Sequence, residues 1–261
     1  MERTYWHKQT KDKPLFPDLL WSRPENRAHA GKLLIVGGNA MGFSAPAEAY
    51  SESLKAGAGS TRVLLPQSIK KELPPAFHEA EFAPNTPSGS FAQSALGELT
   101  SAAEWADGVL LAGDFGRNSE TAILLEKFVQ KYEGQVTVVG DTIDYFFTLA
   151  PEILNRTNTT VVVDMSRLQK LAAGAKFPKP FTSALDFLHV VDLLHEFSEV
   201  SAANIVLVHE KTVFVAVRGE VATTQFENLP HQTKIAAHTS VWWLQNPLKT
   251  FESLTTSLAL L

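Results

Sequence analysis

The feature that most constrains the fold is a repeated unit in which a short apolar run ends at Gly or Asp and helix-like sequence follows. The runs span residues 32–36, 109–113, 135–139 and 159–163. Apolar runs of this length, bounded by turn residues, predict buried strands. Because strands that are apolar on both faces and alternate with helices form parallel sheets, the pattern predicts a parallel sheet with helices on both sides.

The rest of the chain extends this layout. We predict further strands at 61–65, 204–208, 211–217 and 221–225, and helices at 46–55, 90–105, 119–132, 181–200, 233–245 and 248–261, with helical stretches also after 139 and 164. The short links before the last two strands indicate hairpins. The predicted fold is therefore an α/β, three-layer α/β/α sandwich whose mostly parallel sheet ends in a C-terminal antiparallel meander. A TIM barrel is the alternative, but it requires eight strand–helix units.

Two segments fall outside the repeated unit. Residues 1–30 hold scattered Trp and Pro residues without periodicity, and they predict an N-terminal arm beside a single domain at 31–261. The aromatic residues of this arm would pack on the domain or on a second subunit, and the second case would make the protein a homo-oligomer. Residues 73–90 are rich in Pro and predict a long surface loop.

Composition excludes several classes of function. The 261 residues include no cysteine, which excludes disulfide scaffolds, thiolate metal sites and a cysteine nucleophile. The net charge is −5 without a dense stripe of Lys and Arg, so nucleic acid is not an expected partner. We recognise no signal peptide and no apolar run near the roughly 18 residues that a membrane span needs. We therefore expect a cytoplasmic protein that binds small molecules and no membrane.

Carboxylates follow three successive predicted strands. Asp114, Asp141 and Asp164 stand at or just after the ends of these strands. In an open α/β sheet, ligands bind beyond the carboxyl ends of the strands, which lie on one edge. The three carboxylates could therefore converge on Mg²⁺, which takes one or two carboxylates together with phosphate oxygens. The alternative is that each Asp caps the helix that follows it.

The stretch Gly-Gly-Asn-Ala-Met-Gly-Phe-Ser-Ala-Pro at 37–46 joins a predicted strand to a helix. Glycines at such a junction let backbone N–H groups approach an anion at the helix N-terminus. The stretch lacks the Gly-Lys-Ser/Thr of a P-loop and the glycine spacing of a dinucleotide fingerprint. A tight structural turn is the alternative reading.

These residues also carry a resemblance to a known family. Gly-Lys-Leu-Leu-Ile-Val-Gly-Gly-Asn at 31–39, with the segments 43–46, 54–59 and 63–66, resembles the opening of the NAD(P)H-hydrate dehydratases, which belong to the ribokinase-like superfamily. Ala-Gly-Asp-Phe-Gly-Arg at 112–117 is similar to the family's Gly-Pro-Gly-Leu-Gly-Arg segment. The order of elements agrees over most of 20–255, and the motifs are specific over 23–66 and 107–121.

The resemblance implies an activity and a site. Members of the family use ATP or ADP to remove a hydroxyl group from hydrated nicotinamide cofactor, by phosphorylation and then elimination. The implied substrate, NAD(P)H hydrate, would lie at Gly38, Asn39, Phe43, Ser44 and Ala45. The nucleotide would lie at Gly113, Asp114 and Gly116. The implied Mg²⁺ contacts are Asp141 and Asp164.

The sequence departs from the family where the phosphoryl group is transferred. The family's Gly-Ser-Gly-Asp, with its catalytic Asp, opens the penultimate helix, but the matching residues at 230–233 are Pro-His-Gln-Thr. Pro230 supplies no N–H, and Thr233 is no base near neutral pH. Two alternatives therefore stay open: a catalytically silent protein that binds a nucleotide or pyridine cofactor, and a small-molecule kinase with a relocated base. The sequence leaves open whether His231 or His238 has a catalytic task.

Overall fold

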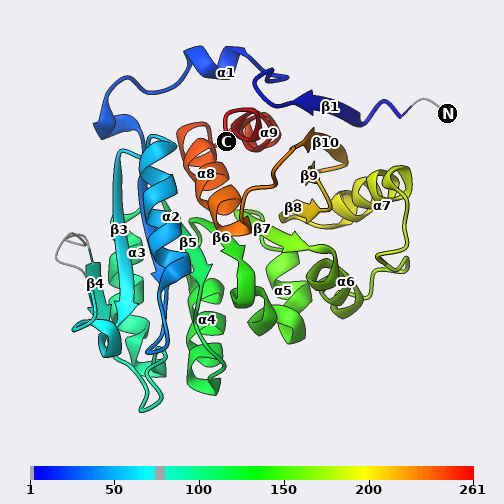
Figure 1. Cartoon of the computed structure of the whole chain (residues 1–261). Helices are drawn as coiled ribbons and strands as arrows, with labels where there is room; N and C mark the ends of the chain where they lie inside the picture. The colour runs from blue at the N-terminus through cyan, green and yellow to red at the C-terminus, as the bar shows by residue number, and fades with distance from the viewer. Residues whose placement is uncertain (1–2, 74–79) are drawn as a thin grey trace.

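A single sheet of ten strands forms the centre of the molecule in this computed structural model, which describes residues 3–73 and 80–261 (Figure 1). The strands are β1 (Trp6–Thr10), β2 (Lys32–Gly37), β3 (Ser60–Pro66), β4 (Ala80–Ala83), β5 (Gly108–Gly113), β6 (Gln135–Val139), β7 (Thr159–Asp164), β8 (Asn204–His209), β9 (Thr212–Val217) and β10 (Glu220–Gln225). Their order across the sheet is β1-β10-β9-β8-β7-β6-β5-β2-β3-β4. Among the described residues, only β9 runs against the other strands.

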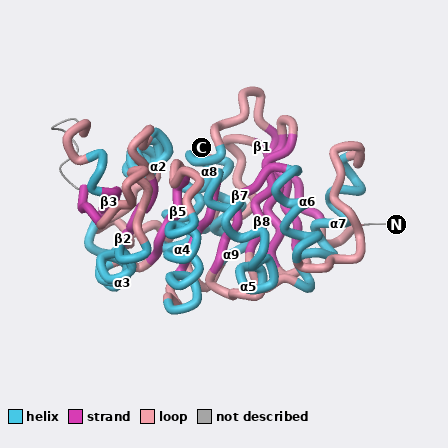
Figure 2. The backbone as a smooth tube through the Cα atoms, turned by 90° about the horizontal axis from the view of Figure 1, so that it is seen from below, coloured by secondary structure: helices cyan, strands magenta, loops and turns pink. Residues whose placement is uncertain are grey.

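Helices cover both faces of the sheet. They are α1 (Asp18–Trp21), α2 (Ser44–Lys55), α3 (Leu96–Trp105), α4 (Ser119–Lys131), α5 (Ala150–Leu154), α6 (Met165–Gly174), α7 (Phe187–Val200), α8 (Gln232–Gln245) and α9 (Thr250–Ala259). A 3-10 segment, Gly140–Leu149, follows β6. One apolar core joins the sheet to α3–α7, and a second joins it to α2, α8 and α9. Figure 2 shows α3, α4 and α5 on one side of the strands and α2 and α8 on the other. The predicted α/β/α sandwich is therefore confirmed.

The apolar strand runs explain the two cores. Successive side chains of a strand point to opposite faces. In β2, Leu34 and Val36 enter the core under α3 and α4, whereas Leu33 and Ile35 enter the core under α2 and α8. All four side chains are buried. Burial stabilises each such residue by about 1.5–3 kcal/mol, so runs that are apolar on both faces favour a central position in the sheet.

Two strands lie where the sequence did not predict them. β1 falls within the predicted arm and pairs in parallel with β10, through residues 221–225. Its sequence, Trp-His-Lys-Gln-Thr, has no apolar run, but Gln9 is buried and its side-chain amide donates to Thr224 and to the backbone oxygen of Thr255. The prediction of a loop throughout 73–90 is wrong at β4, an edge strand of four residues, of which three are half-buried and Ala83 is buried. Residues 74–79 of that loop lie outside the described part.

Two predicted helices begin later than expected. The helix predicted over 181–200 starts at Phe187, because the carboxylate of Asp186 accepts a hydrogen bond from the His189 N–H and caps it. Before it, Phe181 packs on Phe197 with ring centroids 5.5 Å apart. The helix predicted over 90–105 opens with a 3-10 turn, and α3 follows from Leu96. Along 3–73 and 80–261, no helix combines the length and apolarity that crossing a bilayer requires.

The N-terminal segment is fastened to the outer helix and strand. The Arg3 guanidinium donates two hydrogen bonds, of 2.5 and 2.9 Å, to the two carboxylate oxygens of Asp192 in α7. The ring of Tyr5 stacks on His195, with centroids 3.7 Å apart. The N-terminal segment therefore lies along α7 and β10, as Figure 1 shows for β1.

Candidate functional site

The carboxyl edge of the sheet gathers most of the predicted site residues. β2, β5, β6 and β7 are parallel neighbours, so the turns that follow them all leave the same edge. Two of these turns touch, because the Gly38 N–H donates to the Gly113 oxygen at 3.0 Å. A Cβ at Gly37 would lie 2.3 Å from that oxygen, so only glycine allows this approach of β2 to β5.

Asp114 connects the turns at this edge. Its carboxylate accepts hydrogen bonds from the Ser44 hydroxyl at 3.0 Å and from the Ala45 N–H at 2.7 Å. A residue that follows β5 therefore caps α2, the helix that follows the neighbouring strand β2. Its backbone oxygen accepts from the Asn39 side-chain amide. Its own N–H donates to Asp141 at 2.8 Å. Asp114 thus forms hydrogen bonds with four other residues of the predicted site.

The backbone of Asp114 is itself unusual. Its φ is +60°, in the left-handed region that few side chains other than those of Asn and Asp tolerate. Such conformations persist where the surrounding structure enforces them, and they are common at functional sites. Here the four hydrogen bonds of Asp114 supply that constraint.

The Gly-rich turn uses its N–H groups within the protein. The N–H groups of Gly38, Asn39, Ala40, Met41 and Gly42 each donate to another residue's oxygen. The N-terminus of α2, which begins at Ser44, already holds the Asp114 carboxylate. An anion at this helix end would therefore have to displace a negative charge. Phe43 packs on the apolar cluster under α2.

Asp141 lies in the first turn of the 3-10 segment after β6 and is half-buried. Burial raises the pKa of its carboxyl group, and the negative charges of Asp114 and Asp144 act in the same direction. The Asp114 N–H bond opposes this shift without cancelling it. The Asp141 carboxyl group therefore keeps its proton to higher pH than an exposed carboxyl group does.

Asp164 has a different environment from Asp114 and Asp141. It caps α6 by accepting the Arg167 N–H at 2.8 Å, and its other oxygen accepts from the Arg167 guanidinium at 2.7 Å. Burial acts to raise the pKa of Asp164, but these bonds and one from Ser166 hold it below its usual value. Both oxygens are engaged, so Asp164 does not fit the expected role of Mg²⁺ ligand. Over 3–73 and 80–261, no group of three or more His, Asp or Glu side chains forms a metal cage.

A cavity of about 740 Å³ opens beside the ends of β5 and β6. It is lined by Gly116, Arg117, Asn118, Ser119, Asp141, Asp144, Tyr145, Phe147, Arg167 and Lys170. The Tyr145 hydroxyl donates to the Gly116 oxygen and so holds this turn in place. Arg117 and Lys170 make no ion pair with any described residue, whereas Arg167 is held by Asp144 and Asp164. The volume falls in the usual range for small-molecule sites.

The last part of this edge is the start of α8. β10 runs parallel to β8, so it ends at the carboxyl edge, and α8 begins seven residues later at Gln232. No side chain caps α8. Instead, His231 and Lys234 bind Glu48 of α2, with Nδ1 of His231 2.6 Å from Oε2 of Glu48. Thr233 is buried.

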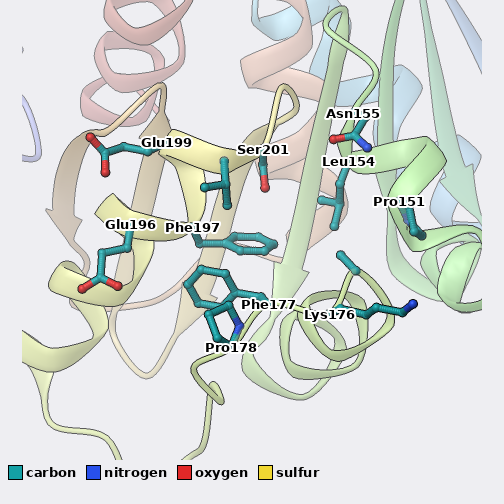
Figure 3. Close-up of a pocket in the computed structure, with 12 residues that line it drawn as sticks. Pro151, Leu154, Asn155, Lys176, Phe177, Pro178, Glu196, Phe197, Glu199 and Ser201 are labelled. Atoms are coloured by element: carbon teal, nitrogen blue, oxygen red, sulfur yellow. The ribbon is translucent and has the colours of Figure 1, made fainter.

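A second cavity lies at the opposite edge and holds none of the predicted site residues. Its volume is about 540 Å³, and it lies where α5 leads into β7 and α7 leads into β8. Figure 3 shows its apolar floor of Phe177, Phe197 and Leu154, with Glu196 and Glu199 at the rim. Glu196 is already paired with Lys179.

Several residues of the edge were not foreseen from the sequence. Tyr145 and Arg167 belong to segments predicted only as helical stretches, and no local pattern marks them. Glu48 lies one turn after Ser44, and this i, i+4 spacing does place both on one face of α2. Gly89 belongs to the predicted surface loop, yet its oxygen accepts from the Ala40 N–H, so this loop forms a wall of the site.

Comparison with known proteins tests the fold. No family model and no curated protein sequence matches the chain. Among solved structures, a ribokinase-like superfamily protein from Enterococcus faecalis aligns with 99% of this chain and 87% of its own, with a TM-score of 0.74 and 16% identity. The ADP/ATP-dependent NAD(P)H-hydrate dehydratase from Bacillus subtilis, co-crystallized with ATP/Mg²⁺, aligns over 94% and 86%, with a TM-score of 0.65 and 10% identity. A hypothetical protein from Streptococcus mutans aligns over 92% and 86%, with a TM-score of 0.67 and 16% identity. The chain therefore has the ribokinase-like fold.

Proposed function

We propose that the protein is a nucleotide-dependent dehydratase of hydrated nicotinamide cofactor, working at the carboxyl edge. The observation that carries this proposal is the junction at Asp114. It joins the turn proposed for the substrate, through Asn39, Ser44 and Ala45, to the cavity proposed for the nucleotide, through Asp141. The likeness in fold to a dehydratase of that name supports the choice of reaction.

Each side of the junction has a proposed task. Gly38, Asn39, Phe43, Ser44 and Ala45 would hold the hydrated ring, and the Ser44 hydroxyl could exchange its bond to Asp114 for one to the ligand. Gly113, Asp114 and Gly116 would border the nucleotide, whose phosphates can reach the unpaired cations Arg117 and Lys170. Charge-assisted hydrogen bonds of this kind are about twice as strong as neutral ones.

The residues fit a magnesium ion only in part. Asp141 has one carboxylate oxygen with no hydrogen bond to any described residue, so it could contribute one ligand beside phosphate oxygens. When bound, Mg²⁺ would neutralise charge on the phosphates. Asp164 is engaged by Arg167 and would orient that guanidinium instead.

A catalytically silent binding protein is the second candidate, and two specific observations favour it. The N–H groups of residues 38–42 are bonded within the protein, and the start of α8 has neither a glycine turn nor its own carboxylate. A phosphoryl-transfer site needs donors that are preorganised around the transferred group. The two candidates differ in turnover and agree on nucleotide binding.

One experiment separates them. Hydrated NADH is incubated with ATP or ADP, and recovery of nicotinamide absorbance is followed while calorimetry measures nucleotide binding. Recovery supports the dehydratase, and binding without recovery supports the silent protein. The double variant Arg117→Glu, Lys170→Glu should weaken nucleotide binding at least tenfold, whereas Lys131→Glu, an exposed cation at the far end of α4, should not. Absence of binding in the unaltered protein would refute both candidates.

A further inference from the structure

We infer that His231 and Glu48 form a catalytic dyad at the start of α8, in which His231 accepts the proton of the substrate hydroxyl and Glu48 positions it. The inference rests on the proposed dehydratase function and assigns it a base. The chain carries Pro-His-Gln-Thr at 230–233 and has no Asp there, so any base at this point must come from another residue.

The geometry of the pair suits proton transfer. Nδ1 of His231 lies 2.6 Å from Oε2 of Glu48, and Nε2 has no partner among the described residues. A carboxylate at Nδ1 fixes the tautomer that leaves Nε2 free to accept a proton, and it stabilises the imidazolium that results. The His231 side chain is 68% exposed and that of Glu48 is 28% exposed, so a ligand can reach the first while the second is partly sheltered.

The position of the dyad connects it to the proposed site. Glu48 lies one helical turn from Ser44, and Ser44 bonds to Asp114. The dyad belongs to α2 and α8, on one face of the sheet, and the cavity beside Asp141 is bordered by the starts of α4 and α6, on the other face. The reaction would join a nucleotide in the cavity to a hydroxyl group held beside Ser44 and His231, at the carboxyl edge of the sheet.

The other histidine–carboxylate pairs do not share these features. His238 binds Glu52 through Nδ1, but its Nε2 is buried. His7 pairs with Glu220 through Nε2 at the outer strands. His189 binds Asp186, the cap of its own helix, and His195 lies 3.9 Å from Glu199 of the same helix, so neither pair joins separate elements. Only the dyad joins two separate elements at the carboxyl edge with an accessible Nε2, among the pairs that the described residues form.

Lys234 places a cation beside the dyad. Lys234 Nζ lies 3.8 Å from the other oxygen of Glu48, and Lys55, Glu52 and His238 follow further along the same two helices. Lys234 can therefore turn toward a phosphate without breaking the 2.6 Å bond of the dyad.

The proposed step balances as a phosphoryl transfer. The hydroxyl oxygen of the substrate forms a bond to the terminal phosphorus of a nucleoside triphosphate. Its O–H bond breaks, and the proton moves to Nε2 of His231. The bond from that phosphorus to its bridging oxygen breaks, and the nucleoside diphosphate leaves with the electron pair. His231 then returns the proton to water.

The test compares two matched histidines. The variants His231→Gln and His189→Gln remove histidines with equal exposure, 68% and 69%, that each bind a carboxylate through Nδ1. With hydrated NADH and ATP as substrates, we expect His231→Gln to lower kcat by at least 100-fold, because general-base catalysis contributes a rate enhancement of about 10²–10⁴. Nucleotide affinity by calorimetry should change less than twofold, and His189→Gln should match the unaltered protein.

Two further readouts distinguish catalysis from a structural ion pair. Imidazole added to His231→Ala should restore part of kcat, because the side chain is exposed and leaves an open space. Glu48→Gln should lower kcat in the parent but not in the His231→Gln background, because Glu48 acts on the reaction only through His231. Turnover that survives in His231→Gln would overturn the dyad and leave the proposed function standing. Nucleotide binding without any turnover in the unaltered protein would overturn the dyad and favour the silent protein.

Discussion

The buried pair of Glu52 and His238 offers the most quantitative test of how α2 and α8 are held together. Nδ1 of His238 lies 3.0 Å from Oε1 of Glu52, and the side chains of His238 and Glu52 are 7% and 8% exposed. His238→Leu would leave the Glu52 carboxylate buried without its main partner. Breaking a buried pair costs about 3–5 kcal/mol. Lys55, 3.7 Å from Glu52, still offsets part of the charge, so we expect the lower end, about 3 kcal/mol.

The assay is unfolding in urea and by heat. For a chain of this size, about 3 kcal/mol corresponds to a fall in Tm of roughly 6–12 °C. The double variant Glu52→Leu, His238→Leu serves as the control, because it removes both charged groups together. Replacing a buried pair by apolar residues is often neutral, so we expect it to return to within about 1 kcal/mol of the parent. If the double variant is as unstable as the single one, packing rather than the unpaired carboxylate is responsible and the reasoning fails.

The same pair predicts a dependence of stability on pH. Burial acts to raise the pKa of Glu52, but the bond to His238 and the charges of His238, Lys55 and Lys234 hold it below its usual value of 4.5. A carboxyl group with a lowered pKa stabilises the folded state above its unfolded pKa, and this contribution disappears as the pH falls through the folded pKa. The parent should therefore lose stability below about pH 4.5 more steeply than the double variant.

Three further predictions follow from other contacts. Asp114→Gly should cost about 1 kcal/mol through loss of the α2 cap, and Asp114→Ala should cost more because alanine disfavours φ +60°; equal Tm values for the two would contradict this. Asp192→Asn should lower the protection of the β1 amides against hydrogen exchange, because it weakens the bond that holds Arg3. The Arg3 bond lowers the pKa of Asp192 to about 2. The parent should therefore lose this protection only as the pH falls from about 4 toward 2. Phe197→Ala should cost about 3–5 kcal/mol by denaturant unfolding, because the ring is buried against Phe181; a loss under about 1 kcal/mol would show that the cavity beside it collapses freely.

The central strands could be predicted because the pattern that marks each of them lies within a few consecutive residues. A run such as Leu33–Val36 is apolar on both faces, and only the middle of a covered sheet accepts it. β1 could not be predicted, because its polar Gln9 is satisfied by Thr224 and Thr255, which are far away in the sequence. The buried environment that makes a polar segment a strand exists only after the rest of the chain has folded.

The site shows the same division between what is local and what is not. That the turns with Asp114, Asp141 and Asp164 share an edge follows from the direction of parallel strands. The role of each carboxylate depends on the partner that reaches it, and those partners come from other segments. Arg167 engages Asp164, whereas Ser44 and Ala45 engage Asp114, and neither pairing has a sequence signature.

The pairing of β1 with β10 has a consequence for how the protein is made. Residues 6–10 leave the ribosome long before residues 220–225, to which they bond in register. Until then this early segment has no neighbour and must wait, with its backbone groups hydrated, while the interior assembles. This hydrogen-bond ladder thus joins an earlier part of the nascent chain to a much later one. A substitution that disrupts β1 or β10 would leave a protein whose central strands are folded and whose outermost strand is unpaired.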